Sequence, residues 1–167
     1  MQVLFNLNTK IKKITFLIII IIIAILETTI LDYFKIFGVK PDLFLVTVVI
    51  AGLSFDLRWA VFFAILAGIL KDLFGANTLY INTFLFPFYS LLTLRLSKKI
   101  SIDNNFFCTA FIFSVAIMNS IIRAIFGSLG NFTVIPVGIY LRIIILESFY
   151  TAATSLLIFE AIGYFTK

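Results

Sequence analysis

The sequence predicts an all-α membrane protein, a compact bundle of about six transmembrane helices. Of the 167 residues, 62% are hydrophobic and only 13% are charged, whereas soluble domains carry about 25% charged residues. The mean hydropathy is +1.18. A soluble domain of this length could not bury so much apolar surface, so lipid must take the place of water around most of the chain.

Six apolar stretches define the predicted spans of a single integral membrane domain, residues 1–167. The first span, 14–34, contains an isoleucine-rich run that is long enough for a crossing helix of about 20 residues. No small-x-small cleavage site follows this run, so we interpret it as a retained anchor rather than a signal peptide. The other spans are expected at 41–56, 58–74, 78–96, 105–126 and 136–163.

The placement of basic residues predicts that both termini lie in the cytoplasm. Lysines precede the first span, and Arg95, Lys98 and Lys99 follow the fourth, as expected because cytoplasmic loops are rich in Lys and Arg. This flanking pattern also accounts for the net charge of +5. No basic patch interleaved with aromatic residues occurs in a soluble segment, so nucleic-acid binding is not expected.

The residue types that are missing exclude several classes of site. The sequence has no histidine and one cysteine, Cys108, which rules out disulfide frameworks, His/Cys metal clusters and His-based triads. It also has no phosphate-binding glycine-rich loop and no closely spaced carboxylate pair. We therefore expect no enzymatic activity, no catalytic residue, no metal and no cofactor.

Polar residues within the apolar stretches are candidate functional residues, because a charge at the centre of a membrane helix costs about 2.5–3.5 kcal/mol. Under the predicted topology, most charged candidates fall on the extracytoplasmic side. Such residues more often hold helices together than bind ligands. The intramembrane or interfacial candidates are Asn82, Asn119, Arg123, Arg142 and Glu147.

The stretch GILKDLFGANTLYIN, residues 68–82, places a lysine beside an aspartate at the end of the third span. Four residues recur at four-residue spacing and form one helix face, small along its length and ending in a carboxylate. Small faces let helices approach closely, so we expect this one to pack against another helix. Its members are Ala60, Ala64, Gly68 and Asp72.

The two charges at the end of this face should point in different directions. We expect Asp72 to form polar contacts inside the bundle, with Arg123 or Arg142 as its cationic partner. Lys71 lies on another face, and we expect it to extend its ammonium to the outer membrane interface.

The stretches GVKPDLFLVTVVIAGL and FFAILAGILKDLFGANTLYINTFLF resemble the family of bacterial rod shape-determining proteins MreD. That family has a Pro-Asn/Asp pair at the start of its second span and a Gly-x-x-x-Asp-Leu end to its third, followed by a small, polar turn. A glycine that is often found before its fourth span is Tyr80 here. The matching residues are Pro41, Asp42, Gly68, Asp72, Leu73, Gly75, Leu79 and Asn82.

The resemblance implies a non-enzymatic scaffold of the cell-elongation complex in the bacterial cytoplasmic (inner) membrane. Such a scaffold binds the bitopic protein MreC and with it supports the MreB cytoskeleton, the RodA glycosyltransferase and its class B penicillin-binding transpeptidase. Peptidoglycan synthesis and rod cell shape depend on that complex. We expect the small face, or the polar surface around Asp72, to dock a partner helix. Membrane lipid and a second copy of the chain are further expected partners.

Two other functions stay open at this point. The S components of energy-coupling-factor transporters are also compact six-span bundles, but they usually carry a small-x-x-x-small pattern in the first span, whereas this chain has FLIIIIIIAILETT. A small intramembrane enzyme would instead use Asp72, Arg123, Arg142 and Glu147. A ligand-sized cavity inside the bundle would distinguish a carrier from a scaffold.

Overall fold

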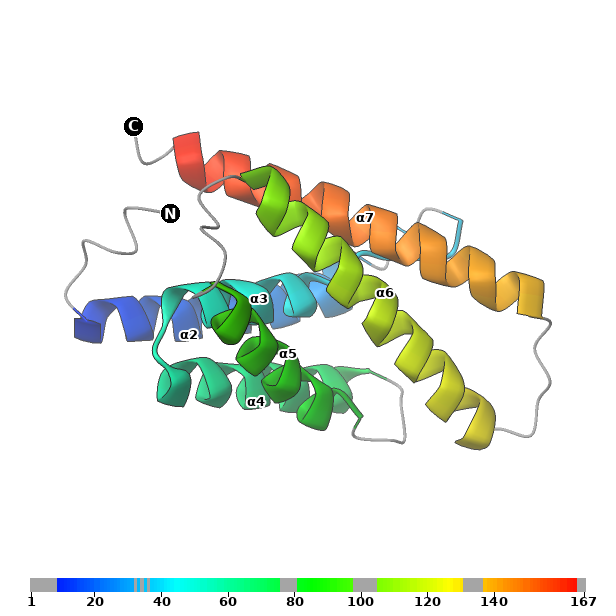
Figure 1. Ribbon diagram of the computed structural model, residues 1–167, viewed down its shortest axis with the longest axis horizontal. Coiled ribbons are helices and arrows are strands. Elements are labelled where there is room, and N and C mark those ends of the chain that lie inside the picture. Colours follow the sequence, from blue (N-terminus) through cyan, green and yellow to red (C-terminus); the bar gives the residue numbers. More distant parts are fainter. Residues whose placement is uncertain are drawn as a thin grey trace.

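The computed structural model is built of helices, and its described part contains no β-strand, as the sequence predicts (Figure 1). It describes residues 9–31, 33, 35, 37–75, 81–97, 105–130 and 137–164. Leu79, Tyr80 and the first residue of the sixth predicted span lie outside this part. The elements are α2 (Thr9–Ile25), the π-helical turn η1 (Leu26–Ile30), α3 (Leu43–Ser54), α4 (Leu57–Phe74), α5 (Ile81–Ser97), α6 (Asn105–Gly130) and α7 (Val137–Tyr164).

Each helix runs opposite to the one before it along the long axis of the molecule (Figure 1). The start of α2 and the end of α7 consequently lie at the same end. Within the described residues, three stretches are long and apolar enough to cross a membrane: Lys10–Ile30, Phe106–Phe126 and Gly138–Glu160. These stretches belong to α2 with η1, to α6 and to α7, and they give the chain the character of a membrane protein.

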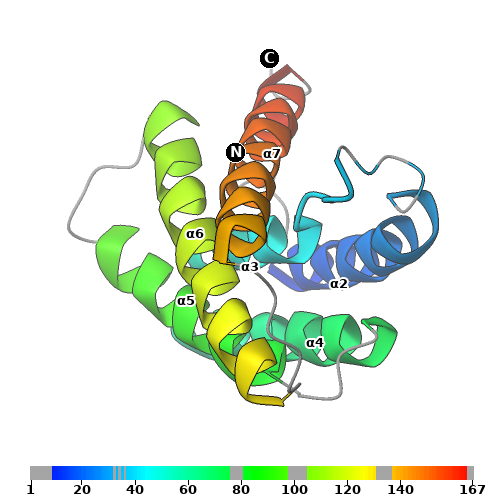
Figure 2. The same cartoon turned by 90° about the vertical axis from the view of Figure 1, so that its right-hand side faces the viewer.

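The second predicted span, 41–56, is shorter than expected and forms the centre of the molecule. It becomes α3, a helix of 12 residues of which ten are buried, and the other helices surround it (Figure 2). A helix that is apolar all round is typical of a buried position. The helix ends early because Phe55 is extended, and Lys12 Nζ donates a hydrogen bond to the Ser54 carbonyl at 2.6 Å.

Helices α4 and α5 form the most closely packed pair along the chain. The four residues of the predicted small face are all buried, with Asp72 3% exposed. A side chain at Gly68 would place its Cβ 2.7 Å from the Asn82 carbonyl oxygen, and one at Gly52 of α3 would place it 2.8 Å from the Ser90 carbonyl oxygen. Only glycine permits helices to approach this closely.

We correct two expectations for this face. Its residues are buried against other helices of the same chain, so the face offers no exposed surface to a partner helix. Asp72 does not pair with Arg123 or Arg142; its carboxylate instead accepts hydrogen bonds from both the backbone and the side chain of Asn82 and of Thr83, at 2.7–3.3 Å. The carboxylate thereby satisfies N–H groups at the start of α5, which a helix leaves without partners.

Helices α6 and α7 form a second, antiparallel pair, which diverges from the other helices in Figures 1 and 2. They contact each other extensively and reach the rest of the chain mainly through α3 and, more weakly, α5. Several polar side chains are buried on these two helices: Asn119, Ser120, Ser148, Thr151 and Ser155. The pair therefore needs specific polar contacts to hold its place beside α3.

We predict that Gly68→Ala destabilises the protein, although alanine favours a helix over glycine by about 1 kcal/mol. The added methyl group would meet the backbone of α5, and overpacking of this kind costs about 1–3 kcal/mol. Thermal unfolding in detergent measures the change. Gly138→Ala is the matched control, because no atom lies within 4 Å of that position. Equal unfolding temperatures for the two variants would contradict the close approach of α4 and α5.

Candidate functional site

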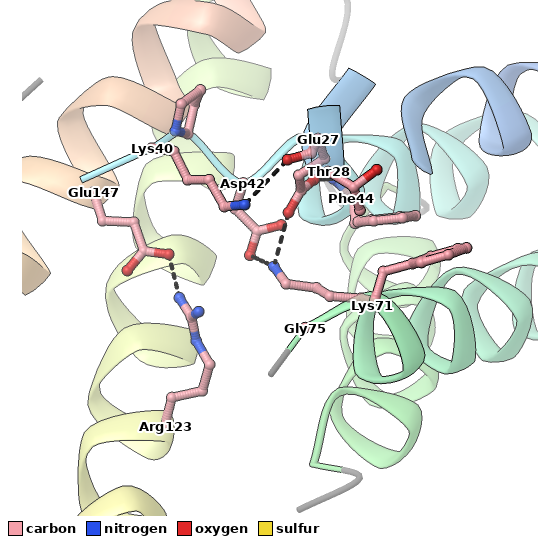
Figure 3. A pocket seen from close by; sticks show the side chains of 11 residues that line it. Glu27, Thr28, Lys40, Asp42, Phe44, Lys71, Gly75, Arg123 and Glu147 are labelled. Carbon is pink, nitrogen blue, oxygen red and sulfur yellow. Dashed lines mark hydrogen bonds and ion pairs between the residues drawn. The ribbon is translucent and has the colours of Figure 1, made fainter. Parts of the chain in front are cut away.

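Six charged side chains from five segments gather where α2 and α4 end and α3 begins (Figure 3). They line a cavity of about 130 Å³, whose walls also include Pro41, Phe44, Phe74 and Gly75. Three of the side chains are acidic and three are basic, so the formal charge of the cluster is zero. The six residues of this charge cluster are Glu27, Lys40, Asp42, Lys71, Arg123 and Glu147.

Asp42 is the residue through which the most segments are joined. Its Oδ1 accepts the N–H of Leu45 at 3.0 Å and so caps α3. Its Oδ2 forms an ion pair with Lys71 of α4 and accepts a hydrogen bond from Asn119 Nδ2 of α6 at 3.3 Å. Its N–H donates to Thr151 Oγ1 of α7 at 3.0 Å. One buried residue thus connects α3, α4, α6 and α7.

Glu27 brings the end of the first helix into the same cluster. It lies in the π-helical turn η1 and is 5% exposed; such turns occur often at functional sites. Its Oε2 accepts the N–H of Phe44 at 3.2 Å, while its carbonyl accepts a hydrogen bond from Lys40 Nζ at 3.0 Å. Two carboxylates, from Glu27 and Asp42, therefore face the positive end of the α3 dipole.

Arg123 and Glu147 form an ion pair that joins α6 to α7. The second carboxylate oxygen of Glu147 accepts a hydrogen bond from Ser120 Oγ at 2.9 Å. Arg123 Nε is buried and has no hydrogen-bond partner among the described residues. Arg123 is thus bound through Nη2, whereas its Nε–H donates no hydrogen bond to the described residues.

Lys71 corrects the expectation that its ammonium extends to the outer interface. Its side chain is 11% exposed, and its Nζ pairs with Asp42 and lies 3.8 Å from Glu27 Oε1. Two carboxylates in surroundings of low dielectric constant attract the ammonium more strongly than an interface does. The adjacent Lys71 and Asp72 therefore both make contacts inside the protein, on two different sides of α4.

Some of the other predicted candidates lie at the charge cluster, and the rest lie outside it. Asn119, Arg123 and Glu147 come together around Asp42 as described. Asn82 binds Asp72 at the start of α5. Arg142 lies over the ring of Phe37, 5.3 Å from its centroid, and does not line the cavity.

Sequence reasoning missed Glu27, Lys40 and Asp42 as site residues. The sequence around Asp42 did indicate a special position, because this carboxylate follows Lys40 and Pro41 and directly precedes an apolar helix. We interpreted that pattern only as the start of a span. Glu27 also carried a signal, because it is a carboxylate inside the first predicted span, 14–34. Its contacts were not predictable, since the π-helical turn that places it arises from its surroundings.

The arrangement is suited to holding helices together. The part of the chain that the structure describes contains no group of three His, Cys, Asp or Glu residues that could hold a metal ion. Asp42 and Glu147 each face a cation at ion-pair distance. A carboxylate engaged in this way is a poor general base, whereas removing its partner leaves a buried charge and costs about 3–5 kcal/mol.

We predict that Asp42→Asn lowers the free energy of unfolding by about 3–5 kcal/mol, because it removes the nearer of the two buried carboxylates that pair with the Lys71 ammonium. Unfolding in detergent measures the effect. Asp56→Asn is the matched control: Asp56 is also an N-cap residue, of α4, but it is exposed and its side chain makes no capping hydrogen bond. An equal and small effect of both substitutions would contradict the role of Asp42.

The comparisons with known proteins give one family assignment. No curated protein and no solved structure shows a significant match to the chain. Residues 10–163 match the family model described as rod shape-determining protein MreD. This match runs from the start of α2 to the end of α7 and includes all six residues of the charge cluster. The chain therefore belongs to the MreD family of rod shape-determining proteins.

Proposed function

We propose that this protein is a non-enzymatic scaffold of the bacterial cell-elongation complex. It binds MreC and with it supports MreB, RodA and the class B penicillin-binding transpeptidase during peptidoglycan synthesis. The observation that carries the proposal is the family match over residues 10–163, since membership of the MreD family implies a role in determining rod cell shape.

The proposal includes six crossings of the cytoplasmic membrane, with both termini in the cytoplasm. The alternating directions of the helices support it (Figure 1). Helix α3 has 12 residues and is too short to cross about 30 Å of hydrocarbon at 1.5 Å per residue. Because it is surrounded by other helices, its polar ends meet protein rather than lipid, which makes a short central helix acceptable.

The outward faces of α2 and α7 are among the surfaces that the chain leaves for lipid and partner helices. Both carry rows of exposed apolar side chains. On α2 these are Ile11, Ile14, Ile18, Ile21, Ile22 and Ile25; on α7 they are Ile139, Leu141, Ile143, Ile145, Phe149 and Leu157. The small face of α4 is occupied within the chain, so the proposal places no partner there.

The size of the cavity favours a scaffold over an S component-like carrier. Small-molecule sites usually have volumes of about 300–1,000 Å³, whereas the cavity beside the charge cluster has about 130 Å³. Its charged lining is also largely committed to ion pairs within the chain. A whole transported solute would have to displace those pairs.

We predict that the tagged protein, extracted from its native host in mild detergent, carries MreC and the elongation synthases with it. Mass spectrometry of the purified material identifies them, and an unrelated tagged polytopic membrane protein is the control. Asp42→Asn should reduce the recovery of MreC, because it loosens α6 and α7 from α3, whereas Asp56→Asn should not. Recovery of an ATPase-coupled transmembrane subunit in place of MreC would contradict the scaffold and support the carrier.

A further inference from the structure

The cavity beside the charge cluster contains groups whose hydrogen-bonding capacity is not fully used. Arg123 Nε is buried without a partner among the described residues. Lys71 Nζ has three donors, and the structure pairs it closely with Asp42 alone. Glu27 Oε1 lies 3.8 Å from Lys71 Nζ, beyond the usual range of a hydrogen bond. The cavity is lined by Arg123, which donates to Glu147 and Ser120 through Nη2 alone, by Lys71 and by Glu27. It therefore offers further guanidinium and ammonium donors and a spare acceptor from Glu27.

The charge balance of the cavity restricts what it can bind. Its six charged side chains sum to zero, and uncompensated charge is costly in surroundings of low dielectric constant. An anion or a cation alone would leave one unbalanced charge. A ligand that carries one charge of each sign keeps the sum at zero and can use donors and acceptor together.

We propose that this cavity binds a zwitterion in which a primary ammonium is linked to a singly charged phosphodiester, as in the headgroup of phosphatidylethanolamine. The phosphate lies at Arg123 and Lys71, because the guanidinium fork matches phosphate geometry and an ammonium adds a second donor. The primary ammonium lies at Glu27, which reaches the cavity from a different side than Arg123 (Figure 3). This binding goes beyond the scaffold function and does not depend on it.

The size and walls of the cavity fit a headgroup of this kind. A volume of about 130 Å³ corresponds to about four water molecules at about 30 Å³ each, which suits a small polar group rather than a large solute. Phe44, Phe74 and Pro41 provide apolar walls. The same chemistry is found in the headgroup of phosphatidylethanolamine and in the free phosphodiester glycerophosphoethanolamine.

Native mass spectrometry of the full chain in detergent tests the proposal with three lipids at equal concentration. Phosphatidylethanolamine should be retained about tenfold better than phosphatidylcholine, whose trimethylated ammonium cannot donate N–H bonds to Glu27, and than phosphatidylglycerol, which lacks the cation. Equal retention of the three lipids would overturn the proposal. This comparison uses the unmodified protein and needs no variant to fold.

Two variants locate the bound lipid. Arg123→Gln combined with Glu147→Gln removes both members of one ion pair, so no buried charge is left unmatched, and Glu27→Gln removes the acceptor of the ammonium. Each should reduce the preference for phosphatidylethanolamine about tenfold, the effect of losing a charged hydrogen bond. Arg142→Gln is the control and should retain the preference, because Arg142 does not line the cavity. An unchanged preference in both test variants would overturn the site.

Competition with free glycerophosphoethanolamine separates the two sources of the zwitterion. Displacement of the lipid supports the site and makes the free compound a sufficient ligand. Retention of the lipid against excess free compound supports the site with the lipid headgroup as its ligand. Recovery of MreC with the same variants is measured in parallel, so that loss of the lipid preference and loss of the scaffold function are distinguished.

Discussion

The ion pair between Asp42 and Lys71 is the contact on which the arrangement of the helices depends. Asp42 caps the central helix α3, and the same carboxylate meets α4 through Lys71 and α6 through Asn119. Its backbone N–H meets α7 through Thr151. Apolar packing among lipid-exposed helices discriminates weakly between arrangements, because lipid chains are as apolar as the side chains. The polar contacts of Asp42 therefore favour α4, α6 and α7 as neighbours of α3.

Charge balance also constrains which charged residues can surround the Asp42–Lys71 pair. Each charge in an apolar chain must be matched, because an unmatched buried charge costs several kcal/mol. The balance is achieved by residues from five segments, with Glu27 and Asp42 at the start of α3 and Arg123 with Glu147 between α6 and α7. With the charges matched inside, the outer faces of the protein stay apolar while its helices keep a fixed order. The cavity left between the charges is the place where a further polar group can enter.

Much of the fold was predictable from the sequence, but the contacts of the site were not. Composition and apolar run length predict an all-α membrane protein. Because charged residues are rare in its apolar stretches, those that occur there, such as Arg123 and Glu147, are candidate functional residues. The length of α3 was overestimated at both ends, because Pro41 and Asp42 precede the helix and the backbone becomes extended at Phe55. The direction of Lys71 and the partner of Asp72 depend on which helices are neighbours, and helical spacing alone does not contain that information. The π-helical turn at Glu27 is likewise a product of packing.

The measurement that tests the central role of this ion pair is a double-mutant cycle on Asp42 and Lys71. The free energy of unfolding is determined in detergent for the unmodified protein, Asp42→Asn, Lys71→Met and the double variant. Each single variant should lose about 3–5 kcal/mol, and the double variant should lose clearly less than the sum, because it leaves no unmatched charge. Additivity within about 0.5 kcal/mol would show that the two residues act independently and would contradict the account.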